Sequence, residues 1–165
     1  MATQTADIAK DGALGQKRPV ERHNRPVRIS HGTLECVSLA ASRPFYEEFL
    51  GLEVVRHGPI SMLLRKGGYW SIVCLQVGRP DRIKLVGVRN HWGIDLESRE
   101  AVEAAHAKAI AMKDKYGIRK VAKIIDNHGT YAFYFQDRDG NWWEFQHVDE
   151  GRYDKFFARG DIVEM

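Results

Sequence analysis

Two histidines and one glutamate are the residues of this sequence most able to do chemistry together. His31, His91 and Glu144 each fall in a run of β-forming residues. The alternation of side chains along a strand places each of them on the face away from the helix-packing side. Two imidazoles and one carboxylate can hold a divalent metal on one side and leave its other positions open, as in non-haem iron(II) and related manganese sites. The three residues therefore predict an open metal centre.

Glu144 follows a turn whose residues are typical of a hairpin. Asp and Asn side chains in the stretch 137–141 can bond nearby backbone, and Gly140 accepts a positive φ. Aromatic β-type runs flank this turn over 131–136 and 142–147. Glu144 then shares a strand face with Trp142 and Gln146, where a buried carboxylate would need a cation, donors or a metal. A solvent-facing Glu on a half-exposed strand is the alternative.

The first half of the chain predicts a strand, a helix and three further strands. The opening strand covers 27–38, and we expect the helix to be capped by Ser42, with Pro44 just inside, and to end at Gly51. The strands that follow are expected over 52–56, 61–65 and 69–77.

The second half repeats this plan. A strand over 86–96 leads to an amphipathic helix capped by Ser98 and ended by Gly117. Strands over 119–125, 131–136 and 142–147 complete it. The sequence therefore predicts an α+β fold of two βαβββ modules that form open barrels. Its expected parts are a disordered arm (1–26), a domain (27–148) with module one (27–77) and module two (86–148), and a charged tail (149–165).

Composition excludes several classes of protein. The net charge of +3 over 165 residues does not imply a nucleic-acid partner, and no apolar run is long enough to span a bilayer. Cys36 and Cys74 are the only cysteines, and both lie in apolar strand-like runs. Two buried thiols without an export signal predict a reducing, cytoplasmic setting.

The chain resembles the vicinal oxygen chelate superfamily over about residues 29–147. The resemblance rests on the repeated βαβββ plan, on the stretch Phe45–Leu52 and on the stretch Asp137–Glu144, where relatives usually carry Pro at the position of Arg138. It implies that His31, His91 and Glu144 are the metal ligands. The spacing of the three residues fits those ligands.

Three further residues are candidates for catalysis. The resemblance to extradiol dioxygenases implies acid–base or hydrogen-bonding roles for Tyr134 and His128, which we expect on the strand paired with that of Glu144. An aromatic residue at position 134 is common across the superfamily, so Tyr134 discriminates poorly. Glu35 shares a strand face with His31 and could contact substrate or act as a base, or it could be a surface residue.

The reaction is expected to be extradiol cleavage of a catechol-like aromatic, with iron(II) as the metal and manganese(II) as the alternative. Glyoxalase I relatives usually carry a fourth ligand on the last strand of module one, where only Cys74 and Gln76 are candidates here. Gln76 also stands where two-domain extradiol enzymes have a second-shell histidine. The alternatives are therefore a lyase or isomerase acting on a metal-chelated carbonyl, and a metal-free small-molecule-binding protein.

We also expect a twofold homodimer. Compact relatives exchange modules, so His31 of one subunit would share a metal with His91 and Glu144 of the other. Tyr153, Phe156 and Phe157 in the tail form an apolar edge of the kind that interfaces bury.

Overall fold

The computed structural model describes residues 23, 26–127 and 129–160. Nearly all of the expected N-terminal arm and the last five residues of the tail lie outside the described residues. Arg28–Val148 form one compact unit, and the described residues from Asp149 onward belong to a second.

Module one contains a four-stranded sheet and one helical segment. Its elements are β1 (His31–Cys36), α2 (Leu39–Pro44), the π-helical turn η1 (Phe45–Phe49), β2 (Glu53–Gly58), β3 (Ser61–Arg65) and β4 (Ser71–Gln76). The strand order is β1-β4-β3-β2, with β1 parallel to β4 and the other pairs antiparallel. A short 3-10 turn, η2 (Pro80–Arg82), lies in the connection to module two.

The helix of module one begins earlier than the sequence predicts. Ser38, not Ser42, is the N-cap, because its side chain accepts a hydrogen bond from the Ala41 N–H at 3.3 Å. Ser42 lies inside the helix, and its hydroxyl donates to Asp139 of module two at 2.5 Å. Pro44 also lies inside the helix, where it has no N–H to donate, and the chain continues as the wider π-helical turn η1.

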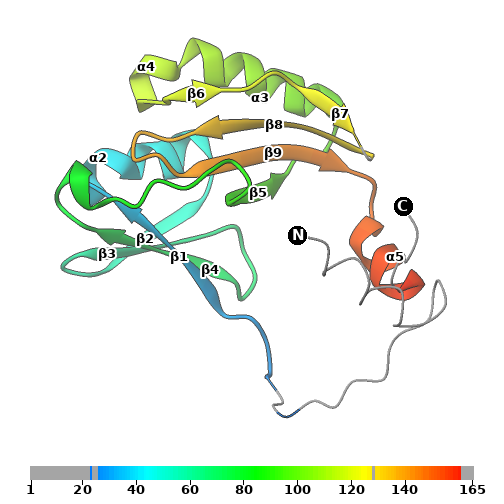
Figure 1. Ribbon diagram of the computed structural model, residues 1–165, viewed down its shortest axis with the longest axis horizontal. Helices are drawn as coiled ribbons and strands as arrows, with labels where there is room; N and C mark the ends of the chain where they lie inside the picture. Colours follow the sequence, from blue (N-terminus) through cyan, green and yellow to red (C-terminus); the bar gives the residue numbers. More distant parts are fainter. Residues whose placement is uncertain (1–22, 24–25, 128, 161–165) are drawn as a thin grey trace, which may run out of the picture. The chain divides into compact units, whose positions relative to one another are not determined.

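Module two repeats the plan with a longer helix (Figure 1). Its elements are β5 (His91–Asp95), α3 (Arg99–Ala111), α4 (Lys113–Tyr116), β6 (Lys120–Val121), β7 (Ile125–Asn127), β8 (Thr130–Gln136) and β9 (Trp142–Val148). The sheet order is β5-β9-β8-β6, β7 also pairs with β8, and α3 packs against β8 and β9. The predicted α+β class with two open βαβββ sheets is confirmed.

Two strand predictions in module two need correction. The strand expected over 119–125 is divided into β6 and β7, both of which pair with β8. The strand expected over 86–96 is paired only from His91 to Asp95. The residues before it make other hydrogen bonds, described below, in place of sheet bonds. The caps of α3 and α4 are as predicted: Ser98 accepts the Ala101 N–H, and Gly117 ends α4 at φ +67°.

One hydrophobic core joins the two modules. Phe45, Tyr46 and Phe49 of module one pack against aromatic rings of β8 and β9, with ring centroids 5.7 Å apart for Tyr46–Trp143 and for Phe49–Phe135. Edge-to-face and tilted pairs of this kind add to the energy of apolar burial. The core therefore fixes which face of β8 and β9 is turned inward.

Two buried aspartates of the β8–β9 turn connect this core to the backbone. Asp137 accepts hydrogen bonds from the hydroxyl of Tyr46, the indole N–H of Trp143, and both the backbone and side-chain N–H groups of Asn141. Burial raises the pKa of Asp137, and the hydrogen bonds from Asn141 and Trp143 oppose that shift. Asp139 accepts from Ser42 and from the Val37 N–H at 2.9 Å, both in module one. The turn therefore fastens module two to module one.

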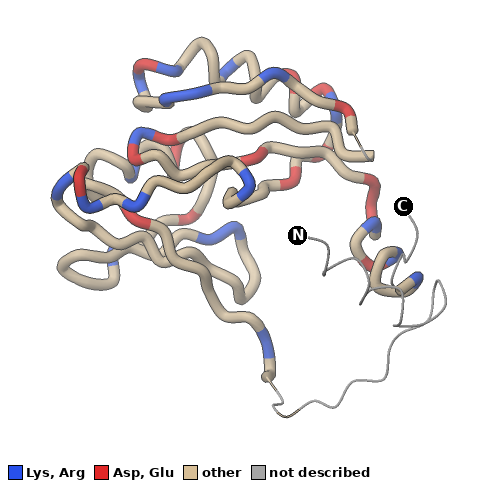
Figure 2. Tube along the Cα trace, viewed as in Figure 1, with Lys and Arg blue, Asp and Glu red and all other residues tan. Residues whose placement is uncertain are grey.

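Charged residues of both signs are interspersed along both modules (Figure 2). Several form ion pairs at the surface, among them Arg43–Glu47, Arg65–Glu53 and Lys115–Glu48.

In the second unit, α5 (Arg152–Arg159) exposes Phe157, and the guanidinium groups of Arg152 and Arg159 each lie 5.1 Å from the ring centroid of Phe156. None of the helices in the described part of the chain is long and apolar enough to cross a bilayer.

We predict that Asp139→Ala lowers the free energy of unfolding by about 3 kcal/mol, because the Val37 N–H and the Ser42 hydroxyl lose a charged acceptor inside the protein. Urea denaturation measures the difference. Arg138→Ala is the matched control. Its guanidinium donates to the Ala41 carbonyl across the same boundary but at the exposed surface, so its loss should cost less than about 1 kcal/mol. Equal losses for the two variants would contradict the proposed role of the buried carboxylate.

Candidate metal centre

Strand register brings His91, Tyr134 and Glu144 to one face of the module two sheet. In the parallel pair β5–β9, Gly93 lies opposite Glu144 and His91 lies opposite Trp142. In the antiparallel pair β8–β9, Tyr134 lies opposite Glu144. The alternate residues Trp143 and Phe145 point into the core, so Glu144 faces the other way. This face is the one that the sequence predicts for the site.

The carboxylate of Glu144 is held between a histidine and a tyrosine. Its Oε2 lies 3.2 Å from Nε2 of His91, and the Tyr134 hydroxyl hydrogen-bonds to Glu144. The Tyr134 and His91 rings meet edge to face at 4.9 Å. Burial, together with the hydrogen bond and the negative charge of Glu144, raises the pKa of Tyr134 to about 12. Tyr134 is therefore a proton donor throughout the neutral range.

Both ring nitrogens of His91 face oxygen acceptors. Nδ1 lies 2.7 Å from the backbone carbonyl of Val88, so this nitrogen carries a proton and donates it. A neutral imidazole then presents only a lone pair at Nε2, and that lone pair points to the carboxylate of Glu144. Such an arrangement needs a positive centre between the two groups, either a second proton or a metal ion. The backbone carbonyl on Nδ1 is also the usual outer partner of a metal-binding histidine.

His31 is not part of this group within the chain. It is exposed at the first residue of β1, and its Nδ1 lies 2.8 Å from the hydroxyl of Ser30. Among the described residues, no three His, Cys, Asp or Glu side chains come together as a group that could hold a metal ion. One chain therefore assembles His91 and Glu144 of the predicted triad and leaves His31 apart.

Two other candidates have different outcomes. Glu35 lies on the same face of β1 as His31, and its carboxylate accepts the Lys84 backbone N–H at 3.4 Å. It does not join His91 and Glu144 in a metal-binding group. His128 lies outside the described residues, so its predicted role stays a prediction.

The face of β4 that accompanies His31 differs from the one inferred from the sequence. In the parallel pair β1–β4, His31 lies opposite Ser71 and Leu34 lies opposite Cys74. Cys74 is therefore buried in the core, and the side chain of Gln76 accepts the Leu39 N–H. The residues that share the face of His31 are Ser71, Val73 and Leu75, none of which carries a carboxylate. Cys74 and Gln76, the candidates for a fourth ligand, therefore lie on the opposite face of β4 from the one beside His31.

A segment that the sequence did not single out orders part of this site. We call residues 83–90, between η2 and β5, the strap. The Val88 carbonyl accepts from His91, the Val86 carbonyl accepts from the indole N–H of Trp142 at 3.2 Å, and the Lys84 N–H points to Glu35. These three contacts come from backbone groups of every second residue. The sequence predicts a linker over 78–84 and a strand over 86–96, whereas the sheet pairing begins only at His91.

The comparisons with known proteins agree with the fold. A family model described as Glyoxalase/Bleomycin resistance protein/Dioxygenase superfamily matches residues 28–145. Since this match spans most of the chain, the protein belongs to this superfamily, which is the vicinal oxygen chelate superfamily. A comparison of the sequence with curated proteins gives no significant match.

Solved structures of the same family share the fold. A lactoylglutathione lyase from Agrobacterium tumefaciens is similar with a TM-score of 0.54 and 20% identity, over 75% of this chain and 96% of that chain. A glyoxalase/bleomycin resistance protein/dioxygenase family enzyme from Burkholderia phytofirmans is similar with a TM-score of 0.58 and 18% identity, over 73% of this chain and 98% of that chain. A glyoxalase/bleomycin resistance protein from Albidiferax ferrireducens is similar with a TM-score of 0.51 and 22% identity, over 73% of this chain and 98% of that chain. At these identities the likeness concerns the fold.

We predict that Glu144→Gln lowers the pKa of Tyr134 from about 12 toward its usual value of about 10 in the metal-free protein, because a charged acceptor is lost while burial remains. Phenolate absorbance during an alkaline titration, read as the difference from the Tyr134→Phe protein, measures it. The raised pKa also means that the contribution of Tyr134 to stability is complete below pH 10 and declines as the pH rises through 12. An unchanged titration in Glu144→Gln would contradict the Tyr134–Glu144 hydrogen bond.

Proposed function

We propose that this protein is a metal-dependent enzyme of extradiol dioxygenase type, which cleaves a catechol-like aromatic ring. Its metal ligands would be His91 and Glu144 of one subunit and His31 of a second copy of the chain. The observation that carries the proposal is the pairing of His91 Nε2 with Glu144 Oε2 at 3.2 Å while Nδ1 is already committed to Val88. These residues fit a divalent cation, because an imidazole nitrogen and a carboxylate oxygen are directed to the same point.

The incomplete triad supports the homodimer. Within one chain His31 stands on a face of module one that also carries Leu63, Val73 and Leu75, all half-buried, and Val55, which is 56% exposed. Apolar residues that stay partly exposed on a sheet face are typical of an interaction surface. A twofold partner that brings its own His91–Glu144 face to this surface would cover these residues and complete two equivalent sites.

The three-ligand pattern favours ring cleavage over the glyoxalase reaction. The family resemblance implies an acidic fourth ligand for glyoxalase I, and the face of β4 beside His31 carries Ser71, Val73 and Leu75 instead. Iron(II), when bound, would supply Lewis acidity and one-electron chemistry toward dioxygen, and manganese(II) is the alternative metal. A lyase or isomerase acting on a metal-chelated carbonyl is the second candidate function, since the similar Agrobacterium protein is named a lactoylglutathione lyase.

The residues of this chain would divide the work at the substrate. Tyr134, whose pKa is raised first by burial, would donate a hydrogen bond to a substrate oxygen near the ligands. Trp142, on the same face as His91, would offer an aromatic surface to the substrate ring. The strap would hold both in place through Val86 and Val88. The free thiols of Cys36 and Cys74 support the proposed cytoplasmic setting, because thiols stay reduced there.

We predict that His31→Ala, His91→Ala and Glu144→Ala each weaken metal binding more than about tenfold, since each removes one of three protein ligands. Elemental analysis after anaerobic loading with iron(II) measures the metal retained. His147→Ala is the control, because His147 lies on β9 but on the opposite face from Glu144, with Nδ1 near the Leu96 carbonyl. Full metal content in the three ligand variants would rule out the triad.

We expect the iron(II)-loaded protein to consume oxygen with a catechol and to form a coloured ring-cleaved product. An oxygen electrode and visible spectroscopy follow the two events, and Glu144→Ala should slow both by at least about tenfold while His147→Ala should not. Conversion of a hemithioacetal without oxygen uptake would replace the dioxygenase proposal by the lyase one. Absence of both activities in protein that retains metal would contradict both assignments.

A further inference from the structure

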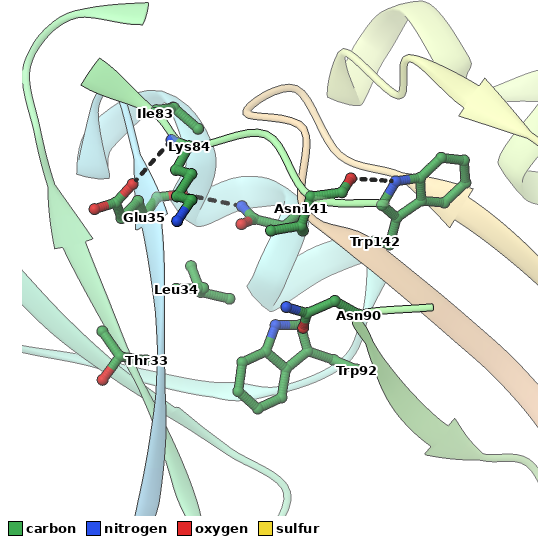
Figure 3. A pocket seen from close by; sticks show the side chains of 10 residues that line it. Thr33, Leu34, Glu35, Ile83, Lys84, Asn90, Trp92, Asn141 and Trp142 are labelled. Atoms are coloured by element: carbon green, nitrogen blue, oxygen red, sulfur yellow. Dashed lines mark hydrogen bonds between the residues drawn. The ribbon is translucent and has the colours of Figure 1, made fainter. Parts of the chain in front are cut away.

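A cavity lies beneath the strap. Its volume is about 270 Å³, and it is bounded by β1, the strap, the start of β5 and the start of β9 (Figure 3). His91 and Glu144 do not line it, so the metal-centre proposal leaves it unassigned. The volume is slightly below the range usual for drug-sized ligands, which suits a small metabolite.

Two opposite charges face this cavity without neutralising each other. The ammonium of Lys84 is directed into it, and the carboxylate of Glu35 lies at its side (Figure 3). Among the described residues, the carboxylate of Glu35 accepts a hydrogen bond only from the backbone N–H of Lys84, at 3.4 Å. Within the described part of the chain, neither Lys84 nor Glu35 has an ion-pair partner within 4.0 Å. Asn90 also lines the cavity, and its side-chain amide has no hydrogen-bond partner among the described residues. The ammonium of Lys84, the carboxylate of Glu35 and the amide of Asn90 are therefore available to bind a ligand in this cavity.

The floor of the cavity is a rigid aromatic surface. Trp92 lies against the backbone of Gly32, where an added Cβ would come within 2.3 Å of the indole ring, and its ring centroid is 5.6 Å from that of Trp70. On the far side, Trp142 is fixed by its hydrogen bond to Val86. Fixed aromatic rings offer contact area to a ligand with little loss of side-chain freedom on binding.

We propose that the cavity under the strap binds a zwitterionic small molecule of the amino-acid class with an apolar side chain. The carboxylate of the ligand would lie on Lys84 and the amide of Asn90, its ammonium on Glu35, and its side chain on Trp92. Charge-assisted hydrogen bonds at both ends would select for a molecule that carries both charges. The cavity shares Trp142 and the strap with the proposed metal centre, but His91 and Glu144 do not line it. The proposal does not depend on metal binding or on the dioxygenase reaction.

Three probes with one phenyl side chain test the proposal on the full-length, metal-free protein. Phenylalanine carries both charges, hydrocinnamate lacks the ammonium, and phenethylamine lacks the carboxylate. Isothermal titration calorimetry should show phenylalanine binding about fivefold more tightly than each of the other two, the amount that one exposed charge pair supplies. Equal affinity for the three probes, or no binding of phenylalanine at millimolar concentration, would overturn the proposal.

Two substitutions then assign the charges. Lys84→Gln should remove the advantage of phenylalanine over phenethylamine, and Glu35→Gln should remove its advantage over hydrocinnamate. Lys66→Gln is the matched control, since the ammonium of Lys66 bonds the Gly51 carbonyl at the surface of module one. If Lys84→Gln and Lys66→Gln reduce the affinity for phenylalanine equally, the effect comes from net charge and the assignment is wrong.

Discussion

The position of Glu144 depends on one buried carboxylate in the turn that precedes its strand. The carboxylate of Asp137 accepts hydrogen bonds from Tyr46, Asn141 and Trp143, and these bonds determine where β9 begins after the turn. A shift of β9 by one residue would turn Glu144 into the core and Trp143 out of it. Gly140 completes the turn at φ +95°, and an added Cβ there would meet Leu85 of the strap at 2.5 Å. The turn therefore sets the strand register and contacts the strap that orients His91.

The same region joins the two modules, which links stability to the site. Asp139 bonds Val37 and Ser42 of module one, while Asn141 bonds the Glu35 carbonyl at 3.0 Å. The strap adds bonds from the connecting segment to His91 and Trp142. The proposed metal ligands, His91 and Glu144, are thus supported by the hairpin turn on one side and by the strap on the other. Support of this kind holds ligands in a productive geometry before the metal or substrate arrives.

The sequence predicted those features that depend on local alternation. His91 and Glu144 share a face because each alternates with core aromatics, and Ser98 and Gly117 end their helices through local bonds. Prediction from the sequence failed where the structure depends on a residue that is distant in the sequence. Ser42 resembles a helix cap, yet its hydroxyl is used by Asp139, which lies 97 residues away in the sequence. The face of Cys74 depends on the pairing of β4 with β1, which alternation within β4 alone cannot reveal.

The central claim is that two copies of the chain complete one metal site. Crystals of manganese(II)-loaded protein, with anomalous scattering recorded at the manganese absorption edge, would test it most directly, since the ion marks its own position. The account predicts one peak in each of two equivalent sites, bonded to His91 Nε2 and Glu144 of one subunit and to His31 of its partner. A peak held by ligands from a single chain, or one that lies away from His91 and Glu144, would contradict it.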